Sequence, residues 1–255
     1  MSMVIKAFIF DLDGCIYFGE QPAAGAADFI KLIENRDMNY CIISNNSSDS
    51  GAEIYNKLSK MGIHTKMKLI TPLLYSGEFL TRFIGKHKTV YVLGSDALSR
   101  AVKHGGHICS DKAPDVVLLG RDEEFNYRKL TQAANYIDNG AKFVITNSDS
   151  SHPAQSVKMP ETGALAASIQ KMCDVKPLII GKPEPFLFNI ALASLQVKAS
   201  EVLMVGDTPD TDIAGGNAAG MQTALIRDDV ASYDAKKVSL TAYNFYDLNS
   251  TLFGL

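Results

Sequence analysis

The sequence lacks the features that mark several classes of protein. Its four cysteines lie far apart and form no CxxC pair, which argues against a zinc site or a disulfide framework and favours a reducing compartment. No apolar run approaches the roughly 18 residues that a membrane span needs. The first residues lead into an expected strand without the apolar stretch of a signal peptide. We therefore expect a cytoplasmic protein that has no membrane partner.

The charged residues form no basic block. The formal net charge is -3 at pH 7, and 21% of the 255 residues are charged while 46% are hydrophobic, as is usual for a globular protein. Nucleic acid is therefore not an expected partner, and neither is an anionic membrane surface. A chain of this length can bury the core of one large domain or of two smaller ones.

Two common nucleotide-binding motifs are absent as well. The glycine-rich residues 215–220 lack the GxGxxG spacing of a dinucleotide fingerprint. Residues 181–183 do not belong to a Walker A loop, because Lys176 and Pro183 stand where that motif needs Gly and Ser or Thr. Taken alone, residues 181–183 predict a turn.

Short apolar runs alternate with stretches of helical spacing along most of the chain. Strands are expected at residues 4–10, 40–43, 89–93, 115–119, 143–145, 178–180, 202–205 and, as the last strand, 223–226. Helices are expected over residues 24–36, 53–61, 72–84, 96–104, 127–138, 162–172, 186–195 and 213–219. This alternation predicts an α/β fold with parallel sheets and right-handed crossovers.

The alternating pattern starts again after residue 84 and returns to its first form after residue 178. We therefore predict a Rossmann-like parallel-sheet core made of residues 1–77 and 179–255. The stretch between them, residues 78–178, is predicted to form an inserted second α/β domain, since its length suits a domain of its own.

Two carboxylates, Asp11 and Asp13, follow the first apolar run. In an extended chain residues i and i+2 point to the same side. Carboxylates placed in this way repel each other unless a cation or a shared proton offsets their charge. The alternative is a strand that ends in an Asx turn closed by Gly14, and this stretch alone favours the turn.

Polar side chains also follow three further runs that are expected as strands. The four strand ends together carry Asp11 and Asp13, then Ser44, Asn45 and Asn46, then Lys182, and finally Asp207 with Asp212. The carboxyl ends of parallel strands lie along one edge of a sheet, so these side chains can converge. Each motif has a simpler alternative, because residues 44–46 alone predict a capping loop and residues 206–212 a turn with a helix N-cap.

Residue types of this kind, brought together, suit phosphoryl transfer. A carboxylate nucleophile can take the phosphoryl group and so divide hydrolysis into two easier steps. Mg²⁺ held by carboxylates lets the two anions meet, while a lysine, a hydroxyl and backbone N–H groups bind the phosphate oxygens. A second carboxylate can protonate the leaving alcohol and later take a proton from water.

In this order the motifs resemble those of the haloacid dehalogenase-like (HAD) superfamily over nearly the whole chain. Within that superfamily the chain is similar to the subfamily with a large α/β cap, the NagD and 4-nitrophenyl phosphatase group. The family's DxD motif falls on Asp11 and Asp13, its hydroxyl on Ser44, its lysine on Lys182 and its acidic motif on Asp207 and Asp212. The middle domain stands where this subfamily carries its cap.

The resemblance implies a Mg²⁺-dependent phosphatase that works through an aspartyl-phosphate intermediate. It implies that Asp11 is the nucleophile and a metal ligand, and that Asp13 is the general acid and base and binds the metal through its backbone carbonyl. Asp13 also favours phosphoryl chemistry over dehalogenation, since a halide leaving group needs no proton. Cys15 departs from the Thr or Val usual in the family, and we expect modest tuning because a thiol is a small apolar group with a weak donor.

The resemblance assigns the remaining motif residues to the phosphate and the metal. It implies that Ser44 and Lys182 hold the phosphate, with Asn45 lending its backbone N–H and Asn46 beside it. It also makes Asp207 a metal ligand and Asp212 a hydrogen-bonding partner behind the ligands.

The expected substrate is a small phosphorylated metabolite, such as a sugar phosphate, a nucleoside monophosphate or a similar phosphomonoester. In the cap, the polar residues 147–160 are expected to face the site and to select the substrate through Asn147, Asp149 and His152; the alternative is a solvated loop. Two other functions stay open, a metabolite-binding or regulatory protein without turnover and a phosphotransferase (mutase) on the same core. A homodimer also stays open, since cap-mediated dimers occur in the group.

Overall fold

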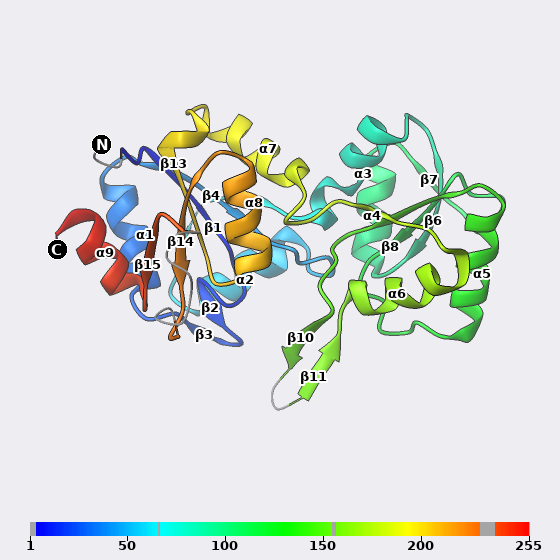
Figure 1. Ribbon diagram of the computed structural model, residues 1–255, viewed down its shortest axis with the longest axis horizontal. Helices are drawn as coiled ribbons and strands as arrows, with labels where there is room; N and C mark the ends of the chain where they lie inside the picture. Colours follow the sequence, from blue (N-terminus) through cyan, green and yellow to red (C-terminus); the bar gives the residue numbers. More distant parts are fainter. Residues whose placement is uncertain (1–3, 66, 155–156, 230–237, 255) are drawn as a thin grey trace. The chain divides into compact units, whose positions relative to one another are not determined.

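A computed structural model of the chain describes residues 4–65, 67–154, 157–229 and 238–254 and divides into two compact units. Unit 1 comprises Met1–Ser44, Gly51–Ile70 and Lys182–Leu255, and unit 2 comprises Asn45–Ser50 and Thr71–Gly181. Each unit is built on its own parallel sheet with helices packed against it, which confirms the predicted α/β class (Figure 1). Within the residues described, no helix combines the length and the apolar character needed to cross a bilayer.

Unit 1 has a six-stranded parallel sheet in the described part of the chain. The strand order is β15-β14-β13-β1-β4-β5, from Leu240–Ala242, Gln222–Ile226, Val202–Gly206, Ala7–Phe10, Asn39–Ile43 and Lys68–Ile70. Its helices are α1 (Ala26–Asn35), α2 (Gly51–Lys60), α7 (Pro185–Leu195), α8 (Ala214–Ala218) and α9 (Phe245–Phe253), with a β2–β3 hairpin (Tyr17–Phe18 and Gln21–Pro22), a 3-10 turn η1 (Ala199–Glu201) and a π-helical turn η2 (Pro209–Ile213). Strands β1 and β13 are buried along their whole length, as expected of a parallel sheet covered on both faces.

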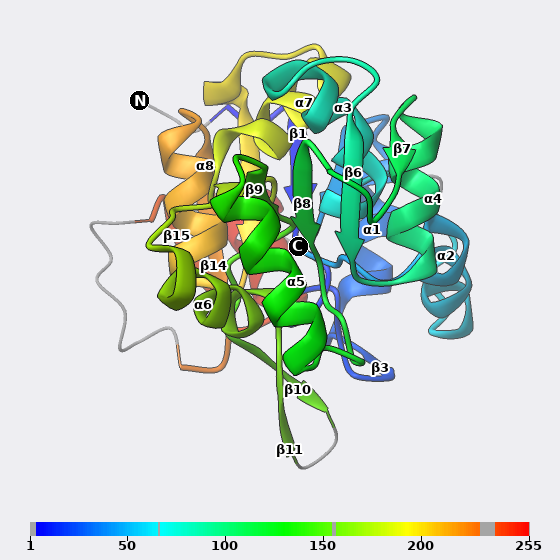
Figure 2. The ribbon, with the colours of Figure 1, turned by 90° about the vertical axis from the view of Figure 1, so that its right-hand side faces the viewer.

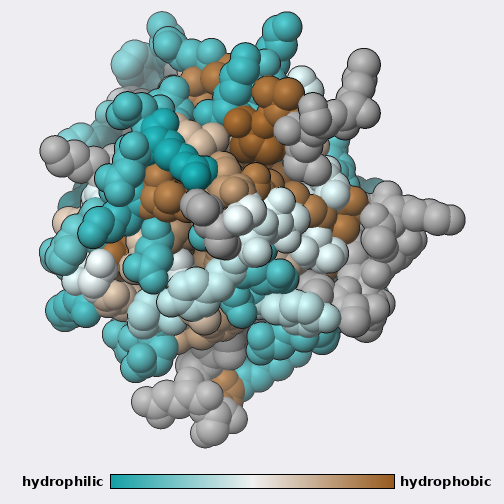
Figure 3. Space-filling model, turned by 90° about the vertical axis from the view of Figure 1, so that its left-hand side faces the viewer, coloured by the Kyte–Doolittle hydropathy of each residue, from teal (hydrophilic) through white to brown (hydrophobic). Residues whose placement is uncertain are grey.

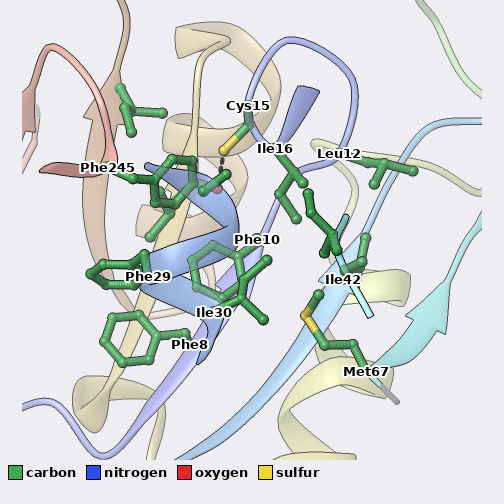
Figure 4. Close-up of a cluster of buried hydrophobic side chains, with 14 of the residues drawn as sticks. Phe8, Phe10, Leu12, Cys15, Ile16, Phe29, Ile30, Ile42, Met67 and Phe245 are labelled. Carbon is green, nitrogen blue, oxygen red and sulfur yellow. Dashed lines mark hydrogen bonds between the residues drawn. The ribbon is translucent and has the colours of Figure 1, made fainter. Parts of the chain in front are cut away.

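An aromatic cluster fixes the central strand β1 (Figure 4). The rings of Phe8 and Phe10 stack with their centroids 5.6 Å apart, and Phe29 of α1 meets Phe8 edge-on at 5.6 Å. Phe245 of α9 adds to the cluster at 6.0 Å from the Phe10 ring. Helices α1 and α9 also pack against each other, so β1 and the residue that follows it, Asp11, are held by a rigid apolar face.

The surface of unit 1 mixes apolar and polar side chains. Figure 3 shows brown patches bordered by hydrophilic residues on the face that it draws. The exposed large apolar residues of this unit include Val4, Phe18, Tyr243 and Tyr246. Scattered exposure of this kind is usual for a folded domain.

Unit 2 has a five-stranded parallel sheet among the residues that the structure describes. Its order is β12-β9-β8-β6-β7, from Leu178–Ile179, Lys142–Ile145, Val116–Leu119, Thr89–Leu93 and Ile108–Cys109. Helices α5 (Tyr127–Asp138) and α6 (Thr162–Cys173) pack on each other and on this sheet (Figure 2). Helix α3 (Pro72–Phe83) packs on α4 (Asp96–His104), and strand β10 (Ser151–Ala154) pairs antiparallel with β11 (Val157–Pro160).

One predicted strand belongs to the other sheet. The sequence pattern places residues 178–180 in the core sheet, directly before Lys182, and this prediction is wrong. Strand β12 is Leu178–Ile179 and pairs with β9 of unit 2, with Ile179 opposite Ile145. A run of two or three apolar residues carries no information on which sheet it joins. Lys182 stands instead in the turn before α7.

The structure also adds elements that the pattern did not predict. Residues 223–226 are not the last strand, because β15 extends the core sheet beyond β14 and α9 follows it. Residues 147–160 are expected as a loop; residues 155–156 lie outside the described residues, and the rest of this stretch contains the antiparallel pair β10 and β11. Strands β2, β3, β5 and β7 were missed because runs of two or three residues show no periodicity.

The two units part at different residues from those that the pattern suggested. Their limits fall between Ile70 and Thr71 and between Gly181 and Lys182, whereas the pattern placed the changes near residues 77 and 179. Helix α3 therefore goes with unit 2, where it packs on α4. The short segment Asn45–Ser50, which the pattern left in the core, also belongs to unit 2.

Candidate active site

Three neighbouring strands of unit 1 end in polar residues at one edge of the sheet. Asp11 follows β1, Ser44 follows β4 and Asp207 follows β13, and these strands lie in the order β13-β1-β4. The amide of Asp11 donates to the carbonyl oxygen of Val205 at 2.8 Å, and the amide of Ser44 donates to that of Ile70 at 3.1 Å. The sheet ladder therefore fixes the backbone of Asp11 and Ser44 at the edge where open α/β sheets bind ligands.

Three carboxylates meet at this edge. One oxygen from each of Asp11, Asp207 and Asp212 lies within 4.8 Å of the other two, the only group of possible metal-binding side chains found among the described residues. Asp11 is 5% exposed and Asp212 is fully buried. Carboxylates this close and this buried need a positive charge beside them.

Lys182 supplies one positive charge to the group. Its Nζ donates to Oδ1 of Asp11 and, at 2.6 Å, to Oδ1 of Asp212, and the side chain is 3% exposed. The sequence predicts Asp11 and Lys182 as site residues but not that Asp212 pairs directly with the lysine. Spacing along the chain cannot indicate such a pair, since the three residues come from separate segments.

The turn after β13 places the carboxylate of Asp212 within hydrogen-bond distance of Lys182. Residues Pro209–Ile213 form a single π-helical turn, a local geometry that is often found at functional sites. The amide of Thr208 donates to Oδ2 of Asp212 at 3.1 Å, while Oδ1 accepts from Lys182. Both oxygens of Asp212 are thus engaged, whereas Asp207 is only partly buried at the strand end.

The group formed by Asp11, Asp207, Asp212 and Lys182 has more carboxylates than cations. Burial raises the pKa of Asp11 well above its usual range; the ammonium of Lys182 lowers it, and the charges of Asp212 and Asp207 raise it further. Burial, and then the charge of Asp212, raise the pKa of Asp207 from its ordinary 3.8 to about 6. Burial opposes the charge of Lys182, but the carboxylates of Asp11 and Asp212 raise its pKa above the ordinary value, so the lysine stays charged at neutral pH.

These residues fit a divalent cation. Carboxylate oxygens are the ligands that hard cations prefer, and three carboxylates against one ammonium leave an excess of negative charge. Burial, and after it the charges of the neighbouring carboxylates, raise the pKa values of Asp11 and Asp207. A divalent ion would offset the excess of negative charge. Because both oxygens of Asp212 are engaged, Asp11 and Asp207 are the carboxylates that could hold the ion.

Two glycines leave room for these carboxylates. A Cβ at Gly14, whose φ is +90°, would lie 2.5 Å from Oδ2 of Asp207, and a Cβ at Gly206 would clash with the side chain of Asp212. Only glycine fits such positions, since any larger residue would displace the carboxylate. The sequence indicated the glycines as turn residues, but not that they make space for the acidic group.

Asp13 lies outside the carboxylate group. Its side chain is exposed, and the chain turns there, with the amide of Gly14 donating to the carbonyl oxygen of Tyr17 at 2.8 Å. Asp11 and Asp13 therefore have different surroundings, although they are two residues apart. The buried carboxylate of Asp11 thus follows the strand, and the turn that the alternative interpretation predicted comes directly after it.

Asn45 and Asn46 belong to the segment of unit 2 that follows Ser44. The carbonyl oxygen of the Asn46 side chain accepts from the amides of Ser48 and Asp49 at 3.1 and 2.8 Å, and its amide donates to Oδ2 of Asp49 at 2.9 Å. The Asn46 side chain thus forms the turn that leads into α2, as the capping-loop interpretation predicts. The side chain of Asn45 donates to Asp149 at 3.0 Å.

The residues expected to select the substrate lie in unit 2. Asn147 is buried and bonded to Asn45, and Asp149 accepts from the same residue. His152 is half-buried, and its Nδ1 lies 3.2 Å from Oε1 of Glu161 without hydrogen-bond geometry. Arg121 contacts the same oxygen through Nη1 at 3.4 Å. The sequence gave no signal for Arg121 or Glu161, because neither is part of a motif.

Cys15 lies in the apolar core behind Asp11. The residue is buried, and its thiol donates to the carbonyl oxygen of Val205 at 3.6 Å (Figure 4). That oxygen also accepts from the amide of Asp11. Burial, followed by the charge of Asp11, raises the pKa of the thiol, so it stays protonated at neutral pH.

We expect the Cys15→Val variant to keep most of its activity. Valine is apolar, larger than cysteine by about one methyl group, and removes only a weak donor, so the free energy of unfolding should fall by about 1 kcal/mol. Denaturant unfolding and kcat on an aryl phosphate measure the two effects, and kcat should stay within about threefold. A large loss of kcat at unchanged stability would show that the thiol acts in the reaction rather than in packing.

The fold and this site define a class of protein, an enzyme of α/β fold with a buried carboxylate–lysine centre at the edge of its parallel sheet. The chain belongs to the haloacid dehalogenase-like hydrolase family, because the sequence model of that family matches residues 5–220. Enzymes of this family generally use a divalent metal, which agrees with the acidic group described above.

Two relatives that are similar in sequence are acid sugar phosphatases. The acid sugar phosphatase of Staphylococcus saprophyticus is 36% identical over 251 residues, which cover 97% of this chain and 96% of that protein. The acid sugar phosphatase of Staphylococcus aureus strain USA300 is 34% identical over 252 residues, covering 97% and 96% of the two chains.

Solved structures agree with these relatives. NagD from E. coli K-12 superposes with a TM-score of 0.85 at 30% identity, covering 94% of this chain and 97% of NagD. The 4-nitrophenylphosphatase of Thermotoga maritima gives a TM-score of 0.88 at 26% identity, covering 96% of each chain. The predicted family, its NagD-like subgroup and the predicted enzyme class, a phosphatase, are confirmed.

Proposed function

We propose that this chain is a Mg²⁺-dependent phosphatase that hydrolyses sugar phosphates and similar small phosphomonoesters through an aspartyl phosphate on Asp11. The observation that carries this proposal is the buried Asp11 carboxylate, held by Lys182 at the strand edge beside Asp207. The names of the relatives, acid sugar phosphatases, favour sugar phosphates over other phosphomonoesters.

The first half of the reaction forms a bond between Asp11 and phosphorus. An oxygen of the Asp11 carboxylate attacks the phosphorus, the bond from phosphorus to the alcohol oxygen breaks, and Asp13 gives its proton to the departing oxygen. Lys182 fixes the orientation of the nucleophile through Oδ1 and offsets the charge of the phosphate. The exposed position of Asp13 lets it exchange protons with solvent.

The second half of the reaction releases phosphate. Water attacks the phosphorus of the aspartyl phosphate, Asp13 takes a proton from that water, and the bond from phosphorus to the Asp11 oxygen breaks. Asp11 returns as a carboxylate paired with Lys182. Mg²⁺, held by Asp11, Asp207 and the backbone carbonyl of Asp13, would supply the positive charge that lets the nucleophile and the phosphate approach.

The remaining site residues hold the phosphoryl group. We assign this role to the hydroxyl of Ser44, the ammonium of Lys182 and the backbone N–H groups of Asn45 and Asn46. Asp212 fixes the position of Lys182 by accepting a hydrogen bond from its Nζ. In this proposal unit 1 is the catalytic core, unit 2 is the cap, and His152 of unit 2 contributes to the choice of substrate.

The test is release of phosphate from 4-nitrophenyl phosphate and from a panel of sugar phosphates, nucleoside monophosphates and other phosphomonoesters. We expect turnover that needs Mg²⁺ and that the Asp11→Asn variant loses by more than about 10³-fold, since the amide cannot form the covalent intermediate. The Asp210→Asn variant is a matched control, because Asp210 is exposed in the turn that carries Asp212.

Each other outcome has a distinct meaning. Undiminished turnover in the Asp11→Asn variant would contradict the mechanism. Tight binding of phosphate esters without turnover across the panel would indicate a metabolite-binding protein. Transfer of the phosphoryl group to a second sugar in place of water would indicate a phosphotransferase. The ratio of kcat/KM values across the panel then defines the substrate.

A further inference from the structure

Three hydrogen bonds of unit 2 close a ring between Asn45 and the residues after β9. The side-chain amide of Asn147 donates to the carbonyl oxygen of Asn45 at 2.9 Å, and the amide of Asp149 donates to the side-chain oxygen of Asn147 at 3.1 Å. The side-chain amide of Asn45 then donates to Oδ2 of Asp149 at 3.0 Å. We call this the Asn45 ring.

Burial makes the Asn45 ring costly to break. Asn147 is 1% exposed, and a buried amide that loses its partner carries the full cost of desolvation. A further bond anchors the segment next to Asn45, because the amide of Arg121 donates to Oγ of Ser47 at 3.2 Å. The segment Asn45–Ser50 is thus tied to unit 2 at two points, its first residue and its third.

A second stretch of chain lies against the Asn45 ring. The amide of Gly181 donates to the carbonyl oxygen of Thr146 at 2.8 Å, and a Cβ at Gly181 would clash with Oδ1 of Asn45 and with the backbone of Thr146. A residue larger than glycine would therefore push Asn45 out of the ring. Asn45 and Gly181 are more than a hundred residues apart in the sequence and are held in contact within unit 2.

Both of these residues are covalently joined to groups that the proposed function assigns to the phosphate. Asn45 directly follows Ser44, and Gly181 directly precedes Lys182. The backbone of Ser44 is held in unit 1 by the ladder bond to Ile70, and the next residue along the chain, Asn45, belongs to the ring of unit 2.

We propose that Asn147 and Asp149 are positioning residues for the phosphate, which act through Asn45 and Gly181 on Ser44 and Lys182. This inference rests on the proposed function, in which Ser44 and Lys182 bind the phosphoryl group. Through these residues the Asn45 ring acts on the phosphate group, which every phosphomonoester shares. The ring therefore sets the affinity for phosphate and does not change how the site discriminates between leaving groups. The sequence-based expectation gave Asn147 and Asp149 the opposite role, selection of the substrate.

The test compares the Asp149→Leu variant, which replaces the acceptor for Asn45 with an apolar side chain, with Asp149→Asn, which keeps an acceptor oxygen and the size of the side chain. The measured quantities are the dissociation constant of inorganic phosphate by calorimetry in Mg²⁺, and kcat and KM for 4-nitrophenyl phosphate and for one sugar phosphate. Asp149→Leu should weaken phosphate binding about tenfold and raise both KM values by the same factor, since small misplacements of binding groups are costly. Asp149→Asn should recover most of the affinity.

Ser148→Ala is the matched control, because this side chain is exposed in the same loop. If Asp149→Leu is too unstable to purify, Asn45→Ala serves instead, since it removes the bond to Asp149 and keeps the backbone bond to Asn147. Should Asp149→Leu shift the ratio of kcat/KM between the two substrates and leave phosphate affinity unchanged, Asp149 selects the substrate and the inference is wrong. Unchanged affinity and unchanged KM values would also overturn it.

The calorimetric measurement separates this inference from the proposed function. A wild-type protein that binds phosphate but hydrolyses nothing would contradict the proposed function, and the effect of Asp149→Leu on phosphate affinity would still decide the role of the ring. A wild-type protein that binds no phosphate at all would overturn both.

Discussion

The Lys182→Met variant is expected to lose both turnover and a large part of its stability. Without the ammonium, the buried carboxylates of Asp11 and Asp212 face each other with no cation between them. Removing one partner of a buried ion pair typically costs about 3–5 kcal/mol. Asp11 would then take up a proton and would no longer be a nucleophile, so kcat should fall by more than about 10³-fold.

The stability loss of Lys182→Met has a pH dependence that can be tested. The lysine stabilises the charged form of Asp11, so its removal should cost most at pH 8 and less as acid protonates that carboxylate. Urea unfolding at several pH values, with Mg²⁺ absent, measures this difference. Lys176→Met is the matched control, because Lys176 is exposed. Wild-type stability of Lys182→Met at pH 8 would contradict the buried pairing.

The second large effect is expected for the Asp207→Asn variant, which should lose activity but gain stability in the absence of metal. A carboxyl whose pKa is raised on folding stabilises the protein fully below its unfolded pKa, near 3.8, and loses that contribution as the pH rises through about 6. At pH 7.5 the ionised Asp207 therefore costs roughly 2–3 kcal/mol. The neutral Asp207→Asn side chain avoids this cost, so the variant should be more stable than the wild type in EDTA at pH 7.5.

The gain of Asp207→Asn should disappear near pH 4, where the wild-type carboxyl is protonated. Addition of Mg²⁺ should raise the Tm of the wild type and leave that of the variant almost unchanged, because a metal ligand is lost. Activity that depends on Mg²⁺ should fall by more than about 10²-fold. Thermal unfolding with and without Mg²⁺ across this pH range, beside Asp210→Asn, gives the comparison. A variant less stable than the wild type in EDTA at pH 7.5 would refute the charge imbalance.

Elements with clear end signals could be predicted to the residue. Helices α4 and α5 and strand β6 have the predicted bounds, and each of the two helices starts at a side chain that caps its first turn, Ser95 and Asn126. The tail carried a similar signal that was missed, since Asn244 caps α9 ahead of the buried Phe245 and Leu248.

Sheet membership could not be predicted in the same way. The apolar run before Lys182 indicates a strand, but only tertiary packing decides that β12 joins the sheet of unit 2. The position of Lys182 beside Asp11 depends on the turn before α7 rather than on a strand end. The motif predicts Lys182 as a site residue, but the lysine does not follow a strand of the core sheet, because β12 pairs with β9 of unit 2.

The candidate site, too, could be predicted only in part. Residue types indicated that Asp11, Lys182, Asp207 and Asp212 work together, because their chemistry is complementary. The sequence could not show that both carboxylate oxygens of Asp212 accept hydrogen bonds, one from Lys182 and one from Thr208. It also could not show that Asp11 and Asp13 differ in burial, since that difference arises from the turn at Gly14.

The assignment of Asn45–Ser50 to unit 2 has a consequence for protein engineering. A chimera that takes residues 71–181 from a relative and leaves Asn45 behind would pair Asn45 of this protein with whichever residues the relative has in place of Asn147 and Asp149. The exchangeable module is therefore discontinuous in sequence, and we expect grafts to retain turnover more often when the short and the long segments come from the same parent.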